Sequence, residues 1–221
     1  MSNRPAPRLY LSVPLVGGPR PLDPAGLAPT LAAMLAAADV AAVLLSLPDA
    51  DDRTLIDQVK LLAPIIQQCG AALLLEGRPD IAAKAGADGA HLSDLDEFQT
   101  ALAMLKPDRI VGCGGLATRH DAMAAAELGA DYVMFGETDA GGQRPSFDFI
   151  LERVAWWAEV FEVPCVGYAG SAAEIEPIAQ AGAEFIAVGE WIFQNTRGPV
   201  QAITEAAARL AMVGTDARIE T

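Results

Sequence analysis

The chain has 221 residues, and 52% of them are hydrophobic, which is enough to bury the core of one large α/β domain. Its 29 acidic side chains outnumber 15 basic ones, and this charge of −14 argues against nucleic acid or an anionic membrane surface as a partner. The three cysteines match no C-x-x-C spacing and the N-terminus carries no signal-peptide pattern, so we expect reduced thiols in a cytoplasmic protein.

Eight short apolar runs are predicted to be buried strands. In chain order they lie in the segments LYLSV, AADVAAVLL, AALLLE, AGADGAHLS, RIVGCG, LGADYVMFG, VPCVGYAG and AGAEFIAVG. The long apolar stretch from Leu27 to Leu47 contains one charged residue, Asp39, where it changes from Ala-rich to β-branched and leucine-rich. We interpret this stretch as a helix followed by a strand, not as a membrane span.

Segments long enough for helices follow these strands. The clearest are Asp51–Gln68, Leu95–Leu105, Arg119–Glu127, Phe147–Val160, Ala172–Gln180 and Pro199–Ala211. Four of the strands also begin with the same short pattern, a small residue and an acid before the apolar run. The acids are Asp39, Asp88, Asp131 and Glu184, between 43 and 53 residues apart. This pattern is typical of a helix end followed at once by a buried parallel strand.

Eight alternating β and α units predict a TIM (β/α)8 barrel in one domain, residues 1–213, followed by a flexible tail, residues 214–221. A doubly wound open sheet is the alternative. In a barrel, chemistry belongs at the mouth, where the strands end at their C-terminal side. The predicted strand ends carry Asp49, Asp51, Asp52, Glu76, Asp94, Asp96, Glu137, Asp139 and Glu190, with Arg78 and Arg144. We expect such a mouth to prefer a divalent metal, or a cationic or neutral ring, to bare phosphate.

Three long segments resemble the thiamine phosphate synthase family and its sister group, the thiazole tautomerases. They are EGRPDIAAKAGADGAHLSDLDE, RIVGCGGLATRHDAMAAAELGADYVMFGET and VPCVGYAGSAAEIEPIAQAGAEFIAV, and the resemblance covers most of the chain. It implies a Mg²⁺-dependent transferase of thiamine biosynthesis that joins an aminopyrimidine pyrophosphate to a thiazole phosphate. It also implies a small-molecule ligand as the partner.

The resemblance assigns roles to residues of this chain. Arg78 matches the family's arginine after the third strand, and Asp96 matches its metal-binding aspartate. With His91 as a candidate general base, the predicted catalytic residues are Arg78, His91 and Asp96, and the predicted metal ligands are Glu76 and Asp96. The phosphate grip at the last two strands falls on Gly170, Ser171, Gly189 and Glu190.

The chain departs from the family pattern where phosphates are handled. Glu76-Gly77 replaces Asn-Asp before Arg78, Gly114 replaces a serine, and Glu190 replaces the serine of the grip. Three hypotheses follow. The first is a family transferase with most phosphate-handling residues substituted. The second is a non-catalytic or repurposed ligand-binding barrel. The third is a tautomerase-like isomerase that uses His91 or Glu76 to move protons.

Several residues allow two interpretations from sequence. His91 is a general base or a support for the fourth strand, and Cys113 is a nucleophile or an inert buried thiol. Glu76 and Asp96 share a cation or form a solvated rim. Gly170-Ser171 is an anion-binding turn, or Ser171 caps a helix together with Glu174. The aromatic group around Trp156-Trp157 packs a helix on the barrel or forms a homodimer surface.

Glu190 raises a separate question, because a carboxylate in a phosphate grip repels the ligand. Two like charges about 4 Å apart repel by about 4 kcal/mol at an effective dielectric constant of about 20. Either the side chain turns away, or the site no longer takes phosphate. In the second case, Glu190→Ser should raise phosphate affinity about tenfold or more.

Overall fold

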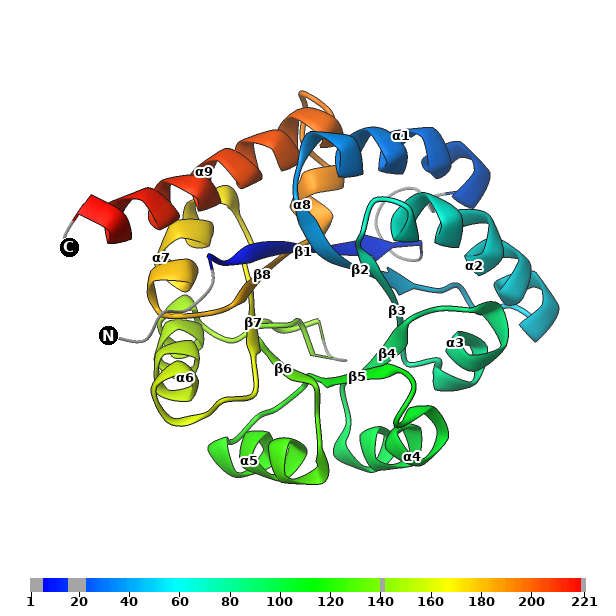
Figure 1. The fold of residues 1–221 in the computed structure, drawn as a ribbon, viewed down its shortest axis with the longest axis horizontal. Helices are drawn as coiled ribbons and strands as arrows, with labels where there is room; N and C mark the ends of the chain where they lie inside the picture. The colour runs from blue at the N-terminus through cyan, green and yellow to red at the C-terminus, as the bar shows by residue number, and fades with distance from the viewer. Residues whose placement is uncertain (1–5, 16–22, 140–141, 220–221) are drawn as a thin grey trace.

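Eight parallel strands close into a barrel in which each strand pairs with the next along the chain and the last pairs with the first (Figure 1). The structure is a computed structural model that describes residues 6–15, 23–139 and 142–219. The strands are β1 (Arg8–Pro14), β2 (Val40–Ser46), β3 (Ala72–Glu76), β4 (Gly89–Leu92), β5 (Ile110–Cys113), β6 (Tyr132–Phe135), β7 (Cys165–Tyr168) and β8 (Phe185–Val188). The predicted TIM barrel is confirmed, and the alternative of an open sheet is wrong.

Helices surround the barrel (Figure 1). They are α1 (Pro24–Ala37), α2 (Asp52–Gln67), α3 (Pro79–Ala85), α4 (Leu95–Leu105), α5 (Arg119–Leu128), α6 (Phe147–Val160), the 3-10 turn η1 (Ala172–Glu174), α7 (Ile175–Gln180), α8 (Glu190–Phe193) and α9 (Pro199–Ile219). Side chains cap five of the longer helices at their N-termini, namely Asp23, Asp51, Asp94, Thr118 and Ser146. These caps accept the backbone N–H groups that a helix start leaves without partners.

The C-terminal helix α9 packs against α1 and α7 on one side of the barrel. It continues to Ile219, past the boundary predicted at residue 213, so the first six residues of the expected tail are its last turns. That this tail is flexible stays a prediction. The apolar stretch from Leu27 to Leu47 is helix α1 followed by strand β2, as expected. Over the described ranges, no helix is both long and apolar enough to cross a membrane.

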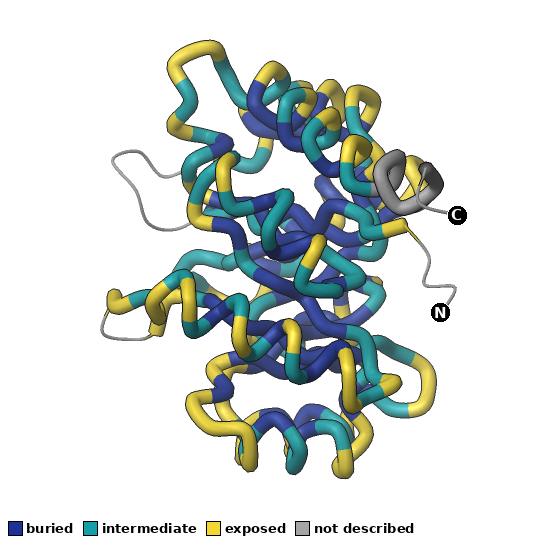
Figure 2. The backbone as a smooth tube through the Cα atoms, turned by 90° about the vertical axis from the view of Figure 1, so that its left-hand side faces the viewer, coloured by how far each residue is buried: buried dark blue, intermediate teal, exposed yellow. Residues whose placement is uncertain are grey.

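The core has two layers. Between strands and helices lie the side chains that point out of the barrel. Figure 2 shows buried residues through the middle of the molecule and exposed residues at its periphery. Inside the barrel lies a smaller cluster, Tyr10, Ala42, Leu44, Leu74, Tyr132, Met134, Val166 and Ala187. Because these side chains fill the barrel, it is a packed core rather than a pore, and a ligand has room only above them, at the C-terminal ends of the strands.

The recurring acids lie at the opposite face, where even-numbered strands begin. Asp88 accepts the backbone N–H of Leu73 at 2.7 Å, and Asp131 accepts that of Val111 at 2.6 Å. Glu184 accepts the N–H of Cys165 at 2.9 Å. Each of these carboxylates therefore ties the start of one strand to the start of the preceding one. Asp39 differs, because it pairs with the Arg8 guanidinium at the start of β1.

The aromatic residues of α6 pack the helix on the barrel. Trp157 is fully buried, stacks on Phe161 with ring centres 4.1 Å apart, and donates its indole N–H to the carbonyl oxygen of Val163. Trp156 is half-buried beneath the Arg119 guanidinium, 4.7 Å from its ring centre. The packing interpretation of this cluster is confirmed, and a homodimer surface stays a prediction.

Candidate functional site

His91 is the last residue but one of β4, and its side chain is fully buried. Its Nδ1 is 2.9 Å from the Tyr132 hydroxyl, which is 2.8 Å from the hydroxyl of Tyr10. Its Nε2 is 2.8 Å from Oε1 of Glu137, in the loop after β6. Both ring nitrogens therefore have protein partners, so the ring is held in place and supports this end of the barrel.

Burial and the neighbouring carboxylates have opposite effects on the pKa of His91. Burial alone lowers the pKa of the imidazole, because it disfavours the charged ring. The charge of Glu137, its hydrogen bond to the ring and the charge of Glu76 raise this pKa, and they outweigh burial. The pKa of His91 therefore lies above its ordinary value, and Glu137 is the main reason.

The predicted metal ligands follow neighbouring strands, Glu76 as the last residue of β3 and Asp96 in the helix after β4. Glu76 ends β3, and its Oε2 accepts a hydrogen bond from the hydroxyl of Ser46 at the end of β2. Asp96 is exposed in the first turn of α4, where the carboxylate of Asp94 accepts its backbone N–H. Among the residues that the structure describes, no group of three or more His, Cys, Asp or Glu side chains could hold a metal ion by itself.

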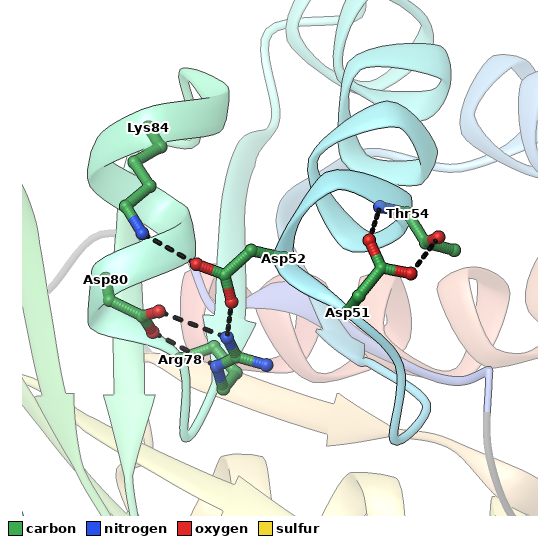
Figure 3. Close-up of polar contacts among 6 residues, drawn as sticks. All are labelled: Asp51, Asp52, Thr54, Arg78, Asp80 and Lys84. Carbon is green, nitrogen blue, oxygen red and sulfur yellow. Dashed lines mark hydrogen bonds and ion pairs between the residues drawn. The ribbon is translucent and has the colours of Figure 1, made fainter.

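Arg78 follows β3, and two carboxylates hold its guanidinium (Figure 3). Asp80 accepts two hydrogen bonds from Arg78, one from Nε and one from Nη2, each at 3.0 Å. Asp52 accepts a third from Nη2 at 3.1 Å. Asp52 also pairs with Lys84 at 2.8 Å. The positive charge of Arg78, a predicted catalytic residue, is therefore balanced within the protein.

The turn after β7 is bound by an internal carboxylate. The N–H of Gly170 donates to Oε2 of Glu174 at 2.8 Å, and the guanidinium of Arg144 contacts both oxygens of Glu174, at 3.1 and 2.6 Å. Arg144 also donates to the carbonyl oxygen of Tyr168 at 2.7 Å. Ser171 begins η1 without a side-chain cap, so the expected serine cap is wrong and Glu174 satisfies the turn instead.

The end of β8 is covered by a tyrosine. A Cβ added to Gly189 would lie 2.4 Å from the Tyr168 hydroxyl, so the tyrosine lies directly on this glycine. The backbone N–H of Glu190 donates to the same hydroxyl. The Glu190 side chain is exposed and accepts from Nε2 of Gln194 at 2.5 Å, one turn along α8. The carboxylate thus lies along the helix, and the backbone of the predicted grip is bound to Tyr168.

A pocket of about 570 Å³ opens at the mouth of the barrel, between the ends of β4, β5 and β6 and the start of α6. Apolar side chains form much of its wall, including Leu116, Met134 and Phe149, and Glu137, Asp139 and Arg144 also line it. Ligand sites are commonly pockets of this size with mostly apolar walls and a few polar groups.

Sequence reasoning placed Glu137 and Arg144 on the rim but assigned them no role, and it missed the two tyrosines beside His91. Tyr10 and Tyr132 look like ordinary strand residues, and only their inward positions in the closed barrel bring them together. Two acids on the rim, Asp51 and Asp94, are helix caps. One signal was available, because S/T/D/N at the residue before a predicted helix indicates a cap.

Cys113 is buried, and burial together with the charges of Glu137 and Asp94 raises the pKa of its thiol to about 12. A thiol with such a pKa carries almost no nucleophilic thiolate at neutral pH. The interpretation of an inert buried thiol is therefore supported over that of a nucleophile.

Comparison with known proteins gives consistent matches. Residues 18–192 match a family described as thiamine monophosphate synthase. The thiamine-phosphate synthase of Rhodospirillum centenum is 41% identical over 201 residues, which cover 90% of this chain and 95% of that protein. The thiamine-phosphate synthase of Hyphomonas neptunium is 34% identical and covers 90% and 92%. The solved structure of thiamine phosphate pyrophosphorylase from Pyrococcus furiosus has a TM-score of 0.74 over 93% of this chain and 96% of its own, at 20% identity, and so shares the fold.

Proposed function

Because the chain belongs to the thiamine monophosphate synthase family, we propose that it joins an aminopyrimidine pyrophosphate to a thiazole phosphate in thiamine biosynthesis. The observation that carries this proposal is the 41% identity to a thiamine-phosphate synthase over 95% of that protein's length. The pocket at the mouth supports it, since its volume of about 570 Å³ suits small-molecule substrates.

The residues at the mouth have distinct parts in this proposal. Arg78 meets the departing pyrophosphate, and to do so its guanidinium exchanges Asp52 or Asp80 for phosphate oxygens, which it binds with the same two-point geometry. His91 supports the site from within the barrel, since both of its nitrogens are bound to protein groups. Gly170 and Gly189, with their neighbours Ser171 and Glu190, face the thiazole phosphate once Glu174 and Tyr168 have moved aside.

The resemblance implies Mg²⁺, and the donors at the mouth suit it. Mg²⁺ takes oxygen ligands and is usually held by one or two carboxylates plus substrate phosphates. Glu76 supplies a carboxylate at the end of β3 and Asp96 one in the first turn of α4, which follows the adjacent strand β4, and we assign the ion to them. When bound, Mg²⁺ would neutralise the charge that develops on pyrophosphate.

A second candidate function is a barrel that binds a ligand without transferring anything. The specific observation in its favour is that Arg78 and Arg144, the two basic residues noted at the mouth from sequence, are both held by carboxylates. A protein with no phosphates to bind has no need to keep these guanidinium groups free.

An assay with both substrates and Mg²⁺ separates the two functions. We expect the native protein to form thiamine phosphate. Asp96→Asn should lower the rate at least about tenfold, because each loss of about 1.4 kcal/mol of stabilisation is a factor of ten. Glu97→Gln, an exposed acid one residue further on α4, is the matched control and should act like the native protein. No product at high protein concentration would eliminate the transferase and leave the ligand-binding barrel.

Two coarser properties complete the proposal. We place the protein in the cytoplasm, because the spacing of its three cysteines fits neither a disulfide framework nor a metal site. We also propose a homodimer through the surface of α6, where Val160 is 59% exposed beside half-buried Trp156. Light scattering after size-exclusion chromatography measures the mass, and a monomer at micromolar concentration would contradict the dimer.

A further inference from the structure

A chain of hydrogen bonds runs from Tyr132 through His91 to Glu137. Of these residues, Glu137 faces the pocket. His91 is fully buried, with a phenol on Nδ1 and a carboxylate on Nε2. It does not line the pocket, whereas Glu137 does and has a side-chain exposure of 14%. A ligand in the pocket therefore meets the carboxylate, and the imidazole can act only through it.

Counting donors fixes how His91 holds this carboxylate. The neutral ring has one N–H and one bare nitrogen. A carboxylate only accepts, so the N–H belongs on Nε2, facing Glu137, and Nδ1 accepts from Tyr132. Tyr10 then donates to Tyr132, and each donor in the chain has an acceptor. If the ring gains a proton at Nδ1, the Tyr132 hydroxyl turns toward Tyr10, and the bond from Nε2 to Glu137 is kept.

The other carboxylate oxygen of Glu137 is held by a backbone hydrogen bond. Oε2 of Glu137 accepts the backbone N–H of Gly115 at 3.0 Å. Gly115 has a φ of +63° and a Cβ there would lie 2.1 Å from the carbonyl oxygen of Ser93, so this backbone position requires glycine. Both oxygens of Glu137 are thus fixed from inside the protein. Each oxygen has a second lone pair, which a ligand can use.

Gly114 leaves the space in which this carboxylate lies. A Cβ on Gly114 would lie 1.7 Å from Oε2 of Glu137 and 2.7 Å from Nε2 of His91. Since real Cβ contacts essentially never fall below 3.0 Å, any side chain at 114 would displace Glu137 from His91. The carboxylate and the glycine are therefore interdependent, although 23 residues separate them in the sequence.

We propose that Glu137 is the specificity-determining residue of this pocket: it accepts a hydrogen bond from an N–H donor on a heteroaromatic ring, and His91, Gly114 and Gly115 keep its carboxylate in place. The apolar walls around Leu116, Met134 and Phe149 suit a flat ring, and an acceptor-only carboxylate suits an amino group or a protonated ring nitrogen. The choice of ring rests on the proposed function, in which one substrate is an aminopyrimidine.

The first test uses binding alone. NMR titration of the full-length protein with 4-aminopyrimidine and with pyrimidine compares rings that differ by one amino group. We expect the native protein to bind the amino ring about tenfold more tightly, and Glu137→Gln, which keeps the shape but not the charge, to lose most of this preference. Glu127→Gln, an exposed acid on α5, is the control. Equal affinity for the two rings in the native protein would overturn the proposal.

The second test asks whether His91 holds Glu137. The chain has only two histidines, and His120 is exposed, so it serves as an internal reference in ¹⁵N-labelled protein. We expect a slowly exchanging Nε2–H signal from His91 in the native protein and a large change in its proton shift in Glu137→Gln. An unchanged shift would show that this carboxylate does not bind the ring.

The third test is a double-mutant cycle on Gly114→Ala and Glu137→Ala. Gly114→Ala should weaken 4-aminopyrimidine binding about tenfold in the native background and have almost no effect once Glu137 is alanine. Gly26→Ala, whose new Cβ would meet no atom closer than 3.4 Å, is the control glycine. Additive effects would contradict the interdependence. If Gly114→Ala fails to fold, Glu137→Gln still decides the proposal.

These tests separate this inference from the proposed function. A protein that passes the binding and NMR tests but forms no thiamine phosphate contradicts only the transferase. A protein that forms product at the native rate and KM with Glu137→Gln contradicts only the role of Glu137.

Discussion

Arg144 and Glu174 form a two-point ion pair between the loop after β6 and the turn after β7. Their side chains are 24% and 18% exposed, so water screens the pair only partly. A Cβ at Gly170 would lie 2.8 Å from Nη1 of Arg144, and the absence of one lets the guanidinium approach the turn. In the proposed function, the carboxylate of Glu174 therefore competes with a ligand phosphate for the guanidinium of Arg144 and the N–H of Gly170.

Removing this carboxylate should open the anion site. In Glu174→Gln, the positive charge of Arg144 is no longer balanced at close range, and we expect the affinity for inorganic phosphate to rise about tenfold. Calorimetric titration of phosphate measures the change. Glu176→Gln, which breaks the pair with Arg209 on α9, is the matched control and should leave phosphate binding unaltered. Weaker phosphate binding by Glu174→Gln would show that Glu174 holds the turn in its binding shape.

The hydroxyl of Tyr168 is expected to compete with phosphate at the end of β8. Tyr168→Phe frees the backbone N–H of Glu190, so phosphate affinity should rise several-fold, by about 1 kcal/mol. Glu190→Ser should change it less than about twofold, because the carboxylate is exposed and bound to Gln194. The same titration compares both variants. A rise of tenfold in Glu190→Ser alone would show that Glu190 turns into the grip when phosphate arrives.

The ion pair of His91 and Glu137 should make stability depend on pH. The folded pKa of His91 lies above its unfolded value, so the stability that protonation contributes is fully present below the unfolded pKa and is lost as pH rises through the folded one. The groups that act on this ring are Glu137 and Glu76, and in Glu137→Gln the main raising cause is gone while burial remains. Urea unfolding at a series of pH values should therefore show Glu137→Gln most destabilised at acidic pH. A difference that is the same at pH values of about 5.5 and 8.5 would contradict this linkage.

The carboxylates at the start of the even strands should matter for stability. Asp131→Ala leaves the N–H of Val111 without its acceptor and Lys106 without its partner, and we expect a loss of about 1–3 kcal/mol. The melting temperature should fall by about 2–4 °C for each kcal/mol of lost stability in a chain of this size. Asp108→Ala, an exposed acid near the same end of the barrel, is the control. Equal melting temperatures for Asp131→Ala and the native protein would show that the carboxylate is dispensable.

Thiol chemistry should distinguish the three cysteines. With iodoacetamide at a pH of about 8, we expect one adduct, on exposed Cys69, because the raised pKa of Cys113 leaves it protonated. Mass spectrometry of Cys69→Ser should show no adduct in the folded protein and two after denaturation. Rapid labelling of Cys113 in the folded chain would show that the mouth opens.

Much of the fold could be predicted from local pattern. The helices Leu95–Leu105 and Phe147–Val160 were predicted, as amphipathic segments after a strand, with the bounds that the structure gives them. In the structure, the side chains of Asp94 and Ser146 cap their starts. Each helix forms its backbone hydrogen bonds within a few residues, and each strand forms them with its neighbouring strands. Eight such units in a row then leave few ways to bury the apolar faces, and the barrel follows.

The sequence by itself therefore indicated eight β/α units, favoured a barrel over an open sheet, and marked the strand ends at which a site must lie, while the structure established the closure. Only the tertiary structure decided which side chains at that mouth act together. Glu137 meets His91 from 46 residues away, and Glu174 meets Arg144 from 30. Position before a helix can identify a rim acid as a cap, but no sequence pattern tells an acid that binds inside the protein from one that faces the pocket. Its role depends on which donors the closed barrel brings within about 3 Å, and that distance is set by packing across the whole fold.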